Sequence, residues 1–242
     1  MKDLQKKAKE KATEEREKNS SFNPEEDPLV LIKGKRPMLQ DLKVRPNISG
    51  KKTSGNLEAH TNGFRFYTKK GEKIDVTFNN IKHAFFQPCD NEMIILIHFN
   101  LHKPIIIGKK RSYDVQFYTE AGLQAEDLDI RRRGNDDDEY EQEERERAQR
   151  KKLNEEFRSF TRAVEAAAKD QIEFDVPYRE LAFEGAPFKS SVKLYPTVHC
   201  LVNLTDTPFF IMTLDEIEVA HFERVQVRKF FVFKRFNIAS MD

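Results

Sequence analysis

The sequence contains no tryptophan, only two cysteines and nine glycines among 242 residues, and no long apolar run. Cys89 and Cys200 lack metal-ligand spacing, so we expect reduced, partly buried thiols rather than a disulfide framework or a zinc site. No stretch approaches the roughly 20 apolar residues of a membrane-spanning helix, and the first residues lack a secretory apolar segment. The protein is therefore expected to be soluble and intracellular, with no membrane partner.

An excess of charge of one sign is also missing, because 42 Lys and Arg residues face 41 Asp and Glu residues and give a net charge of +1. Attraction of the whole chain to a polyanion is thus weak, and any affinity for nucleic acid or membrane has to come from local patches. Catalytic frames are absent too: there is no nucleophile elbow, no phosphate-binding glycine loop and no recognisable carboxylate pair. His98 and His102 sit at the end of a predicted strand, so we expect no metal site there. We predict that the protein is not an enzyme and binds no cofactor.

What the sequence does contain is one short segment used twice. Residues Val76–Gln87 align without a gap on Met212–Glu223. Both copies alternate apolar and polar residues into a turn-forming Asn or Asp, restart at Ile and end on a short stretch that contains an aromatic residue. This pattern predicts a strand, a tight turn and a second strand. The duplication indicates two related modules in tandem rather than one large domain.

Short strand signals fill the region that follows Asn56. Turn chemistry separates them, including Asn62-Gly63, Lys70-Gly71 and Lys103-Pro104. The seven predicted strands are Leu57–His60, Phe64–Thr68, Ile74–Phe78, Ile81–Phe86, Met93–Phe99, Pro104–Ile107 and Asp114–Tyr118. Seven strands so close in sequence predict an antiparallel barrel or sandwich.

A long helix is predicted from Glu139 to Ala168. Its first half is held by i, i+4 pairs of acids and bases, of which Glu143 with Arg147 is one. An apolar stripe of Leu153, Phe157, Phe160 and Val164 marks its second half as the only part that can dock. Seven antiparallel strands capped by one C-terminal amphipathic helix resemble the plan of a pleckstrin-homology (PH) fold, with the stripe plugging the barrel.

Strand signals resume after Asp170, at Ile172–Val176, Val192–Tyr195, His199–Leu204, Phe209–Leu214, Ile217–Phe222 and Phe230–Phe233. No second closing helix follows before Asp242. The expected fold is mainly β with a capping α-helix, as tandem PH-like barrels of which the second lacks its C-terminal helix. The predicted divisions are a connector over residues 1–45, a first module with a charged insertion over 46–169, and an incomplete second module over 170–242. Within the connector, Leu29–Ile32 is a lone apolar run that we expect to lie as a strand or clasp against something folded.

Several segments in order resemble a known family. They include Arg45-Pro46-Asn47-Ile48, Asn80-Ile81-Lys82-His83-Ala84, Phe86-Gln87-Pro88-Cys89-Asp90, Asp114-Val115-Gln116-Phe117-Tyr118 and His221-Phe222-Glu223-Arg224-Val225-Gln226. They resemble the middle domain of the large subunit of the FACT (facilitates chromatin transcription) histone chaperone complex, and the resemblance spans Arg45 to Asp242. It implies a tandem PH module of a nuclear, chromosome-bound, non-enzymatic chaperone that binds core histones and loosens and rebuilds nucleosomes. It also implies an HMG-box small subunit, which a preceding dimerisation domain contacts.

Two sets of charged residues are candidates for contacts with histones or with nucleosomal DNA. The basic set lies in predicted loops and consists of Lys51, Lys52, Lys69, Lys70, Lys109, Lys110 and Arg111. The acidic set, which could meet basic histones, consists of Glu126, Asp127, Asp136, Asp137, Asp138 and Glu139. Each set also has the simpler interpretation of solvated turn lysines or a solvated helix start.

Two other functions remain open from the sequence. PH modules of another kind bind phosphoinositides with a Lys in the first strand and a basic-x-basic pattern in the second. Here the predicted second strand reads Phe64-Arg65-Phe66-Tyr67, so the partner base is missing. A purely structural role as a scaffold between subunits is the third possibility.

Overall fold

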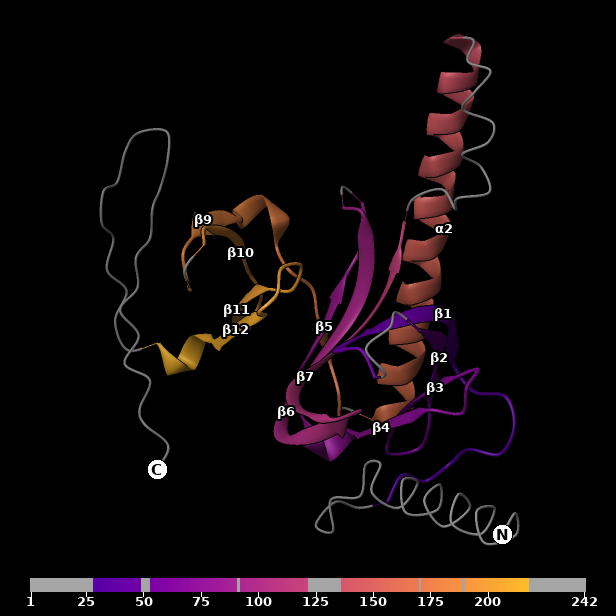
Figure 1. Cartoon of the computed structure of the whole chain (residues 1–242), viewed down its shortest axis with the longest axis vertical. Coiled ribbons are helices and arrows are strands. Elements are labelled where there is room, and N and C mark those ends of the chain that lie inside the picture. Colours follow the sequence, from indigo (N-terminus) through magenta and orange to yellow (C-terminus); the bar gives the residue numbers. More distant parts are fainter. Residues whose placement is uncertain are drawn as a thin grey trace, which may run out of the picture. The chain divides into compact units, whose positions relative to one another are not determined.

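The computed structural model describes residues 28–48, 53–90, 92–121, 136–169, 171–188 and 190–217, and for residues 136–142 only the backbone (Figure 1). The chain divides into two compact units between Phe174 and Asp175. Each unit is described by itself below.

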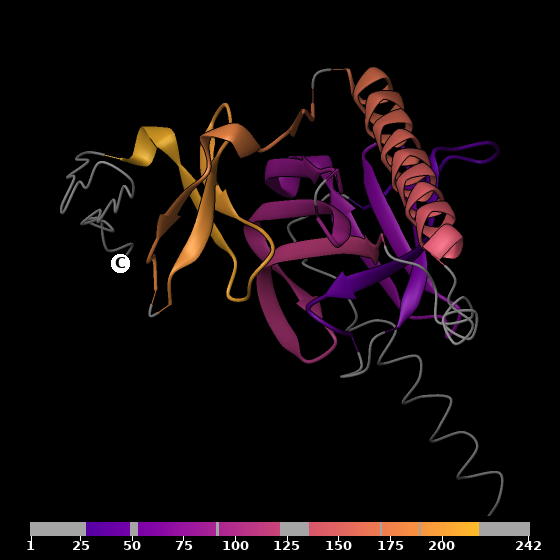
Figure 2. The same cartoon turned by 90° about the horizontal axis from the view of Figure 1, so that it is seen from above.

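The first unit is built on one eight-stranded sheet. Its strands are β1 (Met38–Arg45), β2 (Ser54–Ala59), β3 (Gly63–Thr68), β4 (Lys73–Thr77), β5 (Ile81–Gln87), β6 (Ile94–Ile107), β7 (Lys110–Glu120) and β8 (Phe174–Asp175). Their order in the sheet is β4-β3-β2-β1-β7-β6-β5-β8. The pairs from β4 to β5 are antiparallel, and the sheet curls around an apolar core that includes Phe64, Phe66, Phe99 and Phe117 (Figure 2).

This barrel confirms the expected fold, but two of its strands differ from the prediction. Strand β1 had been assigned to the connector, although it pairs with both β2 and β7. Its pattern is hard to recognise because a bulge between Leu39 and Leu42, with Asp41 at a φ of 53°, breaks the alternation of apolar residues. The predicted boundary at residue 46 is therefore wrong for residues 38–45, which belong to the first unit.

The second misplacement concerns β6, which unites two predicted strands. Lys103-Pro104 is not a turn between strands but part of an irregularity in the β6–β7 register between Asn100 and Ile105. The Asn80 side chain stabilises this point. It accepts a hydrogen bond from the Lys103 amide at 2.8 Å and donates one to the Lys103 carbonyl at 3.1 Å. A buried amide side chain thus satisfies backbone groups where the strand ladder is interrupted.

Helix α2 (Asp136–Ala168) begins three residues before its predicted start and covers one side of the curled sheet (Figure 2). Phe157, Phe160 and Val164 are buried in the core, with Leu153 partly buried against it. Burying such side chains stabilises the docked helix by about 1.5–3 kcal/mol each. The first half of α2 extends beyond the sheet, and there Arg147 lies 3.6 Å from Glu143 in the expected i, i+4 pair (Figure 1).

The first unit also extends past its predicted end at residue 169. Ile172 and Phe174 are buried in its core, and the Phe174 amide donates a hydrogen bond to the Glu165 carboxylate at 2.9 Å. Strand β8 pairs in the first sheet rather than in the second. The segment Ile172–Val176 had been assigned to the second module because its strand signal follows the helix, which gives no information on the sheet it joins.

The expected clasp at Leu29–Ile32 lies against the β2–β3 turn. The Val30 amide donates to the Asn62 side-chain oxygen at 2.7 Å, and the Ile32 amide donates to Nδ1 of His60 at 3.2 Å. Thr61 in turn donates its amide hydrogen to the Val30 carbonyl at 3.3 Å. The segment before β1 is thus fixed to the β2–β3 turn by hydrogen bonds.

The second unit contains a four-stranded sheet in the order β12-β11-β10-β9. Its strands are β9 (Phe183–Gly185), β10 (Val192–Pro196), β11 (Cys200–Asn203) and β12 (Phe210–Thr213). Three of them match predicted strands, whereas β9 was missed because it is only three residues long. Leu194, Leu201 and Phe210 form a small core. The predicted strands Ile217–Phe222 and Phe230–Phe233, and the expected lack of a closing helix, concern residues outside those that the structure describes.

The repeated segment forms the same turn in both units. After β4, residues Phe78–Asn80 make one turn of 3₁₀-helix, and after β12, Leu214–Glu216 do the same. An extended Thr precedes each turn and an extended Ile follows it. Beyond Ile217 the second copy leaves the described part of the chain. Up to that residue, the sequence repeat is a structural repeat.

Candidate functional site

Three connections of the first unit lie at one end of its strands. Lys43 pairs with Ser54, Gly55 pairs with Thr68, and Arg45 pairs with Gln116, so the β1–β2, β3–β4 and β6–β7 connections all leave at the same end. A Cβ atom on Gly108 would meet the Ile48 carbonyl, which places the first and third connections in direct contact. All seven basic candidates belong to these three connections or to the first residues of β7. We call this end of the unit the basic end.

The β6–β7 connection presents its three candidate bases to solvent. Ile107 pairs with Lys110, leaving a two-residue loop of Gly108 and Lys109. Gly108 has a φ of 62°, the left-handed conformation that glycine adopts without strain. Lys109, Lys110 and Arg111 are exposed, and no ion pair or hydrogen bond engages their side chains within the described residues. Their charges are thus available to a ligand.

The β3–β4 connection brings Lys69 and Lys70 to the same end. Both side chains are exposed. Thr68 organises the turn, because its carbonyl accepts a hydrogen bond from Gly71 at 3.0 Å and its hydroxyl accepts one from the Glu72 amide at 3.2 Å. Lys51 and Lys52, in the β1–β2 connection, lie outside the described residues.

The acidic candidates are not part of the basic end. Asp136, Asp137, Asp138 and Glu139 form the first turn of α2, where negative charge complements the helix dipole. Only their backbone is described. Glu126 and Asp127 precede the helix in a segment outside the described residues. A histone-contacting role for either group stays a prediction.

A polar cluster under the hairpin was missed by the sequence analysis. Asp114 accepts a hydrogen bond from Asn100 at 2.8 Å and lies 3.2 Å from Nε2 of the fully buried His98. Burial alone would raise the pKa of Asp114, but the hydrogen bond and charge of His98 and the Asn100 amide outweigh it and lower that pKa. His98 and Asn100 lie on the same side of β6, and Asp114 faces Asn100 on β7. Only the strand register reveals this arrangement. The cluster fixes the base of the hairpin behind its basic tip.

A second buried polar group lies beneath the clasp and was also missed. Glu58 is only 4% exposed and forms an ion pair with Arg36 at 2.7 Å. Burial tends to raise the pKa of Glu58, yet the hydrogen bonds from Arg36 and Tyr67 bring it below its ordinary value. Neighbouring His60 has a lowered pKa, because burial outweighs the attraction of Glu58. The Arg36–Glu58 ion pair thus joins the segment between the clasp and β1 to strand β2.

The first three strands of the sheet lack the basic pattern of a phosphoinositide-binding PH module. With β1 included, Phe64–Tyr67 belongs to the third strand rather than the second. The actual second strand, Ser54–Ala59, contains no Lys or Arg. Arg65 is engaged by both carboxylate oxygens of Asp75 at 2.7 Å, and Lys43 of the first strand lies 2.7 Å from Glu120. Lys43 and Arg65 are therefore paired with acids of the same unit.

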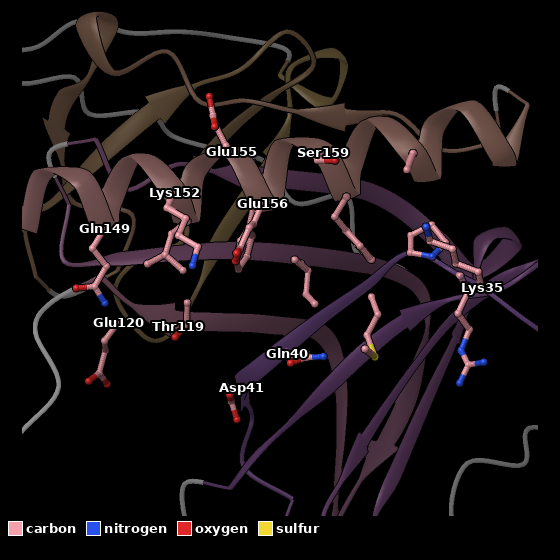
Figure 3. A pocket seen from close by; sticks show the side chains of 18 residues that line it. Lys35, Gln40, Asp41, Thr119, Glu120, Gln149, Lys152, Glu155, Glu156 and Ser159 are labelled. Carbon is pink, nitrogen blue, oxygen red and sulfur yellow. The ribbon is translucent and has the colours of Figure 1, made fainter. Parts of the chain in front are cut away.

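A pocket of about 1060 Å³ lies between α2 and the first half of β1 (Figure 3). Leu39, Leu153 and Phe157 contribute apolar surface to it, whereas Lys152 and Glu156 give it opposite charges. Glu155 and Ser159 of the same helix also line it (Figure 3). Among the described residues, no cluster of three or more His, Cys, Asp or Glu side chains could hold a metal ion.

Two families of known proteins match parts of the chain. Residues 37–164 match the family model of the FACT complex subunit SPT16 PH-like domain, and residues 184–239 match that of the histone chaperone Rttp106-like middle domain. Neither family is one of enzymes. The match beginning at residue 37 agrees with the structure in including β1.

Relatives match nearly the whole chain. It is 50% identical over 98% of its length to the FACT complex subunit spt-16 of Caenorhabditis elegans, and 45% identical over 98% to the FACT complex subunit SPT16 of Dictyostelium discoideum. The chain spans about a quarter of these relatives, 24% and 23% of their lengths. A solved structure titled "Structure of the Spt16D Pob3N heterodimer" is similar at 12% identity over 78% of each chain, with a TM-score of 0.34 that is too low to support any argument. No helix within the described residues is both long and apolar enough to cross a membrane.

Proposed function

The chain belongs to the family of the FACT complex subunit SPT16, and from this premise we propose that it is a histone chaperone module in the nucleus, acting on chromosomes. It binds core histones and helps to disassemble and reassemble nucleosomes during transcription, replication and repair. The observation that carries this proposal is 50% identity over 98% of the chain to a FACT complex subunit. The match of the second unit to a histone chaperone middle domain supports it.

Such a function needs binding surfaces rather than reactive groups. Histones are basic and nucleosomal DNA is acidic, so a module that separates them benefits from surfaces of both signs. The first unit carries a basic end and, apart from it in sequence, the run of acids that begins α2. In this proposal the acids of the helix start contact histones, and the basic end makes weak, local contacts with nucleosomal DNA.

The proposal includes a second subunit. An HMG-box small subunit joins the complex through a domain that precedes this chain, and residues before β1 form the link to it. Because the clasp holds residues 30 and 32 to the sheet by direct hydrogen bonds, the link enters the first unit at a fixed position.

Binding to histone tetramers tests the proposal. The whole chain is immobilised and offered histone H3–H4 tetramers across a salt series, with and without competing DNA. We expect micromolar or weaker retention that free DNA reduces. A chain destabilised by Phe157→Ala serves as the control for binding by unfolded protein.

Absence of tetramer binding at low salt, with the fold verified by circular dichroism, would contradict the chaperone function. Retention of the small subunit without histones would support the scaffold function instead. Salt-sensitive binding to phosphoinositide vesicles without histone binding would favour the lipid function.

A further inference from the structure

The β6–β7 hairpin extends beyond both of its neighbours in the sheet. Strand β5 pairs with β6 only as far as Leu101, and β1 pairs with β7 only as far as Gln116. From His102 to Val115 the two strands therefore form a ribbon on their own. Strand pairing resumes at Ile105 with Ser112 and continues to the turn.

The two faces of this ribbon differ. Ile105, Ile107 and Val115 are buried in the core, so the inner face packs on the barrel. On the outer face, Ile106 pairs with Arg111, and Tyr113 follows two positions later on the same side. Ile106 is 42% exposed and Tyr113 is 55% exposed. An exposed ring and an aliphatic side chain thus flank a guanidinium group.

The ribbon carries charge of one sign in a chain that is nearly neutral as a whole. From His102 to Tyr113 the sequence contains Lys103, Lys109, Lys110 and Arg111 and no Asp or Glu. The next acid, Asp114, is bonded to Asn100 and His98. Lys69 and Lys70, beside the single acid Glu72, lie at the same end of the sheet. The basic end therefore has local charge complementary to a polyanion, although the net charge of the chain is only +1.

We infer that the turn and the outer face of the β6–β7 ribbon bind the sugar–phosphate backbone of duplex DNA. Lys109 and Lys110 at the turn and Arg111 on the outer face contact phosphates, and Tyr113 lies against the backbone and donates its hydroxyl. These are the groups that bind DNA backbones without reading sequence. The bases follow an exposed ribbon instead of lining an enclosed pocket, which suits an extended backbone better than a single lipid headgroup. The inference deepens the DNA contact within the proposed function and does not require histone binding.

Binding to a DNA duplex of about 30 base pairs, measured by fluorescence anisotropy across a salt series, tests the inference. The test variant combines Lys109→Gln, Lys110→Gln and Arg111→Gln in the whole chain. Each lost phosphate contact is expected to reduce the slope of log K against log salt by about 1, so the triple variant should lose roughly 2–3 units of slope. Its affinity at low salt should fall by at least about tenfold.

A matched variant removes the same charge elsewhere. Lys151→Gln, Lys152→Gln and Arg162→Gln on α2 also delete three exposed positive charges. This variant should keep the DNA affinity and slope of the unaltered chain. An equal loss in both variants would show that binding follows net charge alone and would overturn the inference.

Substitution of Tyr113 tests whether DNA contacts the outer face of the ribbon or only its basic tip. Tyr113→Ala should weaken DNA binding severalfold with unchanged slope, while Tyr113→Phe should lose only the part due to the hydroxyl. An unaffected Tyr113→Ala variant would overturn the assignment of the outer face. No DNA binding even at low salt would overturn the inference entirely, as would binding of phosphoinositide vesicles in place of DNA.

Histone binding is measured in parallel to keep the two proposals separate. The hairpin variant should retain H3–H4 tetramers while losing DNA. Loss of DNA binding in a chain that never bound histones would support this inference and contradict the chaperone function. Intact histone binding, together with unchanged DNA binding by the triple hairpin variant, would support the chaperone function and contradict this inference.

Discussion

The two copies of the repeated segment adopt one backbone conformation in two different environments. Thr77 and Thr213 precede the turns with φ and ψ of −82° and 147°, and −68° and 134°. Phe78 in the first copy is only 4% exposed, whereas its counterpart Leu214 is 37% exposed. The local sequence therefore sets the path of the chain, but the surrounding core decides how much each copy contributes to stability.

The contacts of the first copy explain the difference. Phe78 packs edge-on against Phe64 with ring centroids 5.2 Å apart, inside a core that α2 closes. Asn80 is buried and bonds the Lys103 backbone with both ends of its amide. In the second copy, Leu214 and Glu216 face solvent for a large part of their surface.

The largest expected effect comes from removing a buried aromatic side chain by which α2 packs on the sheet of the first unit. Phe157 is 2% exposed and stacks on Phe86 with centroids 6.3 Å apart. Phe157→Ala should lower the free energy of unfolding of the first unit by about 3–5 kcal/mol, because it leaves a cavity between helix and sheet. Denaturant unfolding followed by tyrosine fluorescence and circular dichroism measures it. Glu155→Ala, on the exposed side of the same helix, is the control and should change stability by less than about 0.5 kcal/mol.

The same experiment separates the two units. If they fold independently, Phe157→Ala shifts one unfolding transition and leaves a second in place. A single transition that shifts as a whole would show that the stability of the second unit depends on the first. The two copies of the turn could then not be compared as parts of independent units.

Matched substitutions in the two turns give a smaller effect. Asn80→Ala removes both hydrogen bonds between a buried amide side chain and the Lys103 backbone and should cost about 1–3 kcal/mol. Glu216→Ala, at the equivalent position of the exposed turn, should cost less than Asn80→Ala, because its side chain is exposed and Asn80 is buried. Equal losses would mean that the turn itself, rather than its burial, carries the stabilisation. Thermal unfolding of both variants decides.

The smallest effect on the stability of the first unit is expected when the pH is lowered. Although burial raises the pKa of Glu58 and Asp114, their hydrogen-bond partners lower each below the ordinary values of 4.5 and 3.8. Folding therefore favours the ionised carboxylates. Their contribution is fully present above those ordinary values and is lost as the pH falls through the lower pKa values of the folded state.

Denaturant midpoints measured between about pH 6 and pH 3 test this dependence. The first unit should lose stability mainly at the acid end of that range. Asp114→Asn should make the dependence less steep, since the amide does not titrate. An identical pH profile in this variant would exclude Asp114 as a source of the acid sensitivity.

Much of the barrel could be predicted because its strands alternate between apolar and polar residues. Strands β3, β4 and β5 lie within about a residue or two of their predicted bounds. Strand β1 could not be recognised, since the bulge at Asp41 changes which residues face the core. Likewise Lys103-Pro104 has the composition of a turn, but the residues on either side of it pair with β7 and the Asn80 amide bonds the Lys103 backbone, so it lies within a strand.

The candidate site was predictable in its parts but not in its assembly. Lys69, Lys70 and Lys109–Arg111 were identified as exposed turn residues from composition. Their convergence at one end depends on the antiparallel register of six strands, which no local pattern contains. Ile106 falls within the predicted strand Pro104–Ile107, whereas Tyr113 falls in no predicted strand. Their exposure on the outer face of a ribbon appears only once the inner face has a core.

By itself the sequence determined the tandem plan, the helix stripe, the repeated turn and the family, because periodicity, turn chemistry and long motifs are local properties. The tertiary structure decided which strands complete the first barrel, that Ile172 and Phe174 belong to its core, and that the β1–β2, β3–β4 and β6–β7 connections lie at one end of the sheet. Those features depend on pairing and burial between residues far apart in the chain. Such contacts form only when the whole sheet closes around one core.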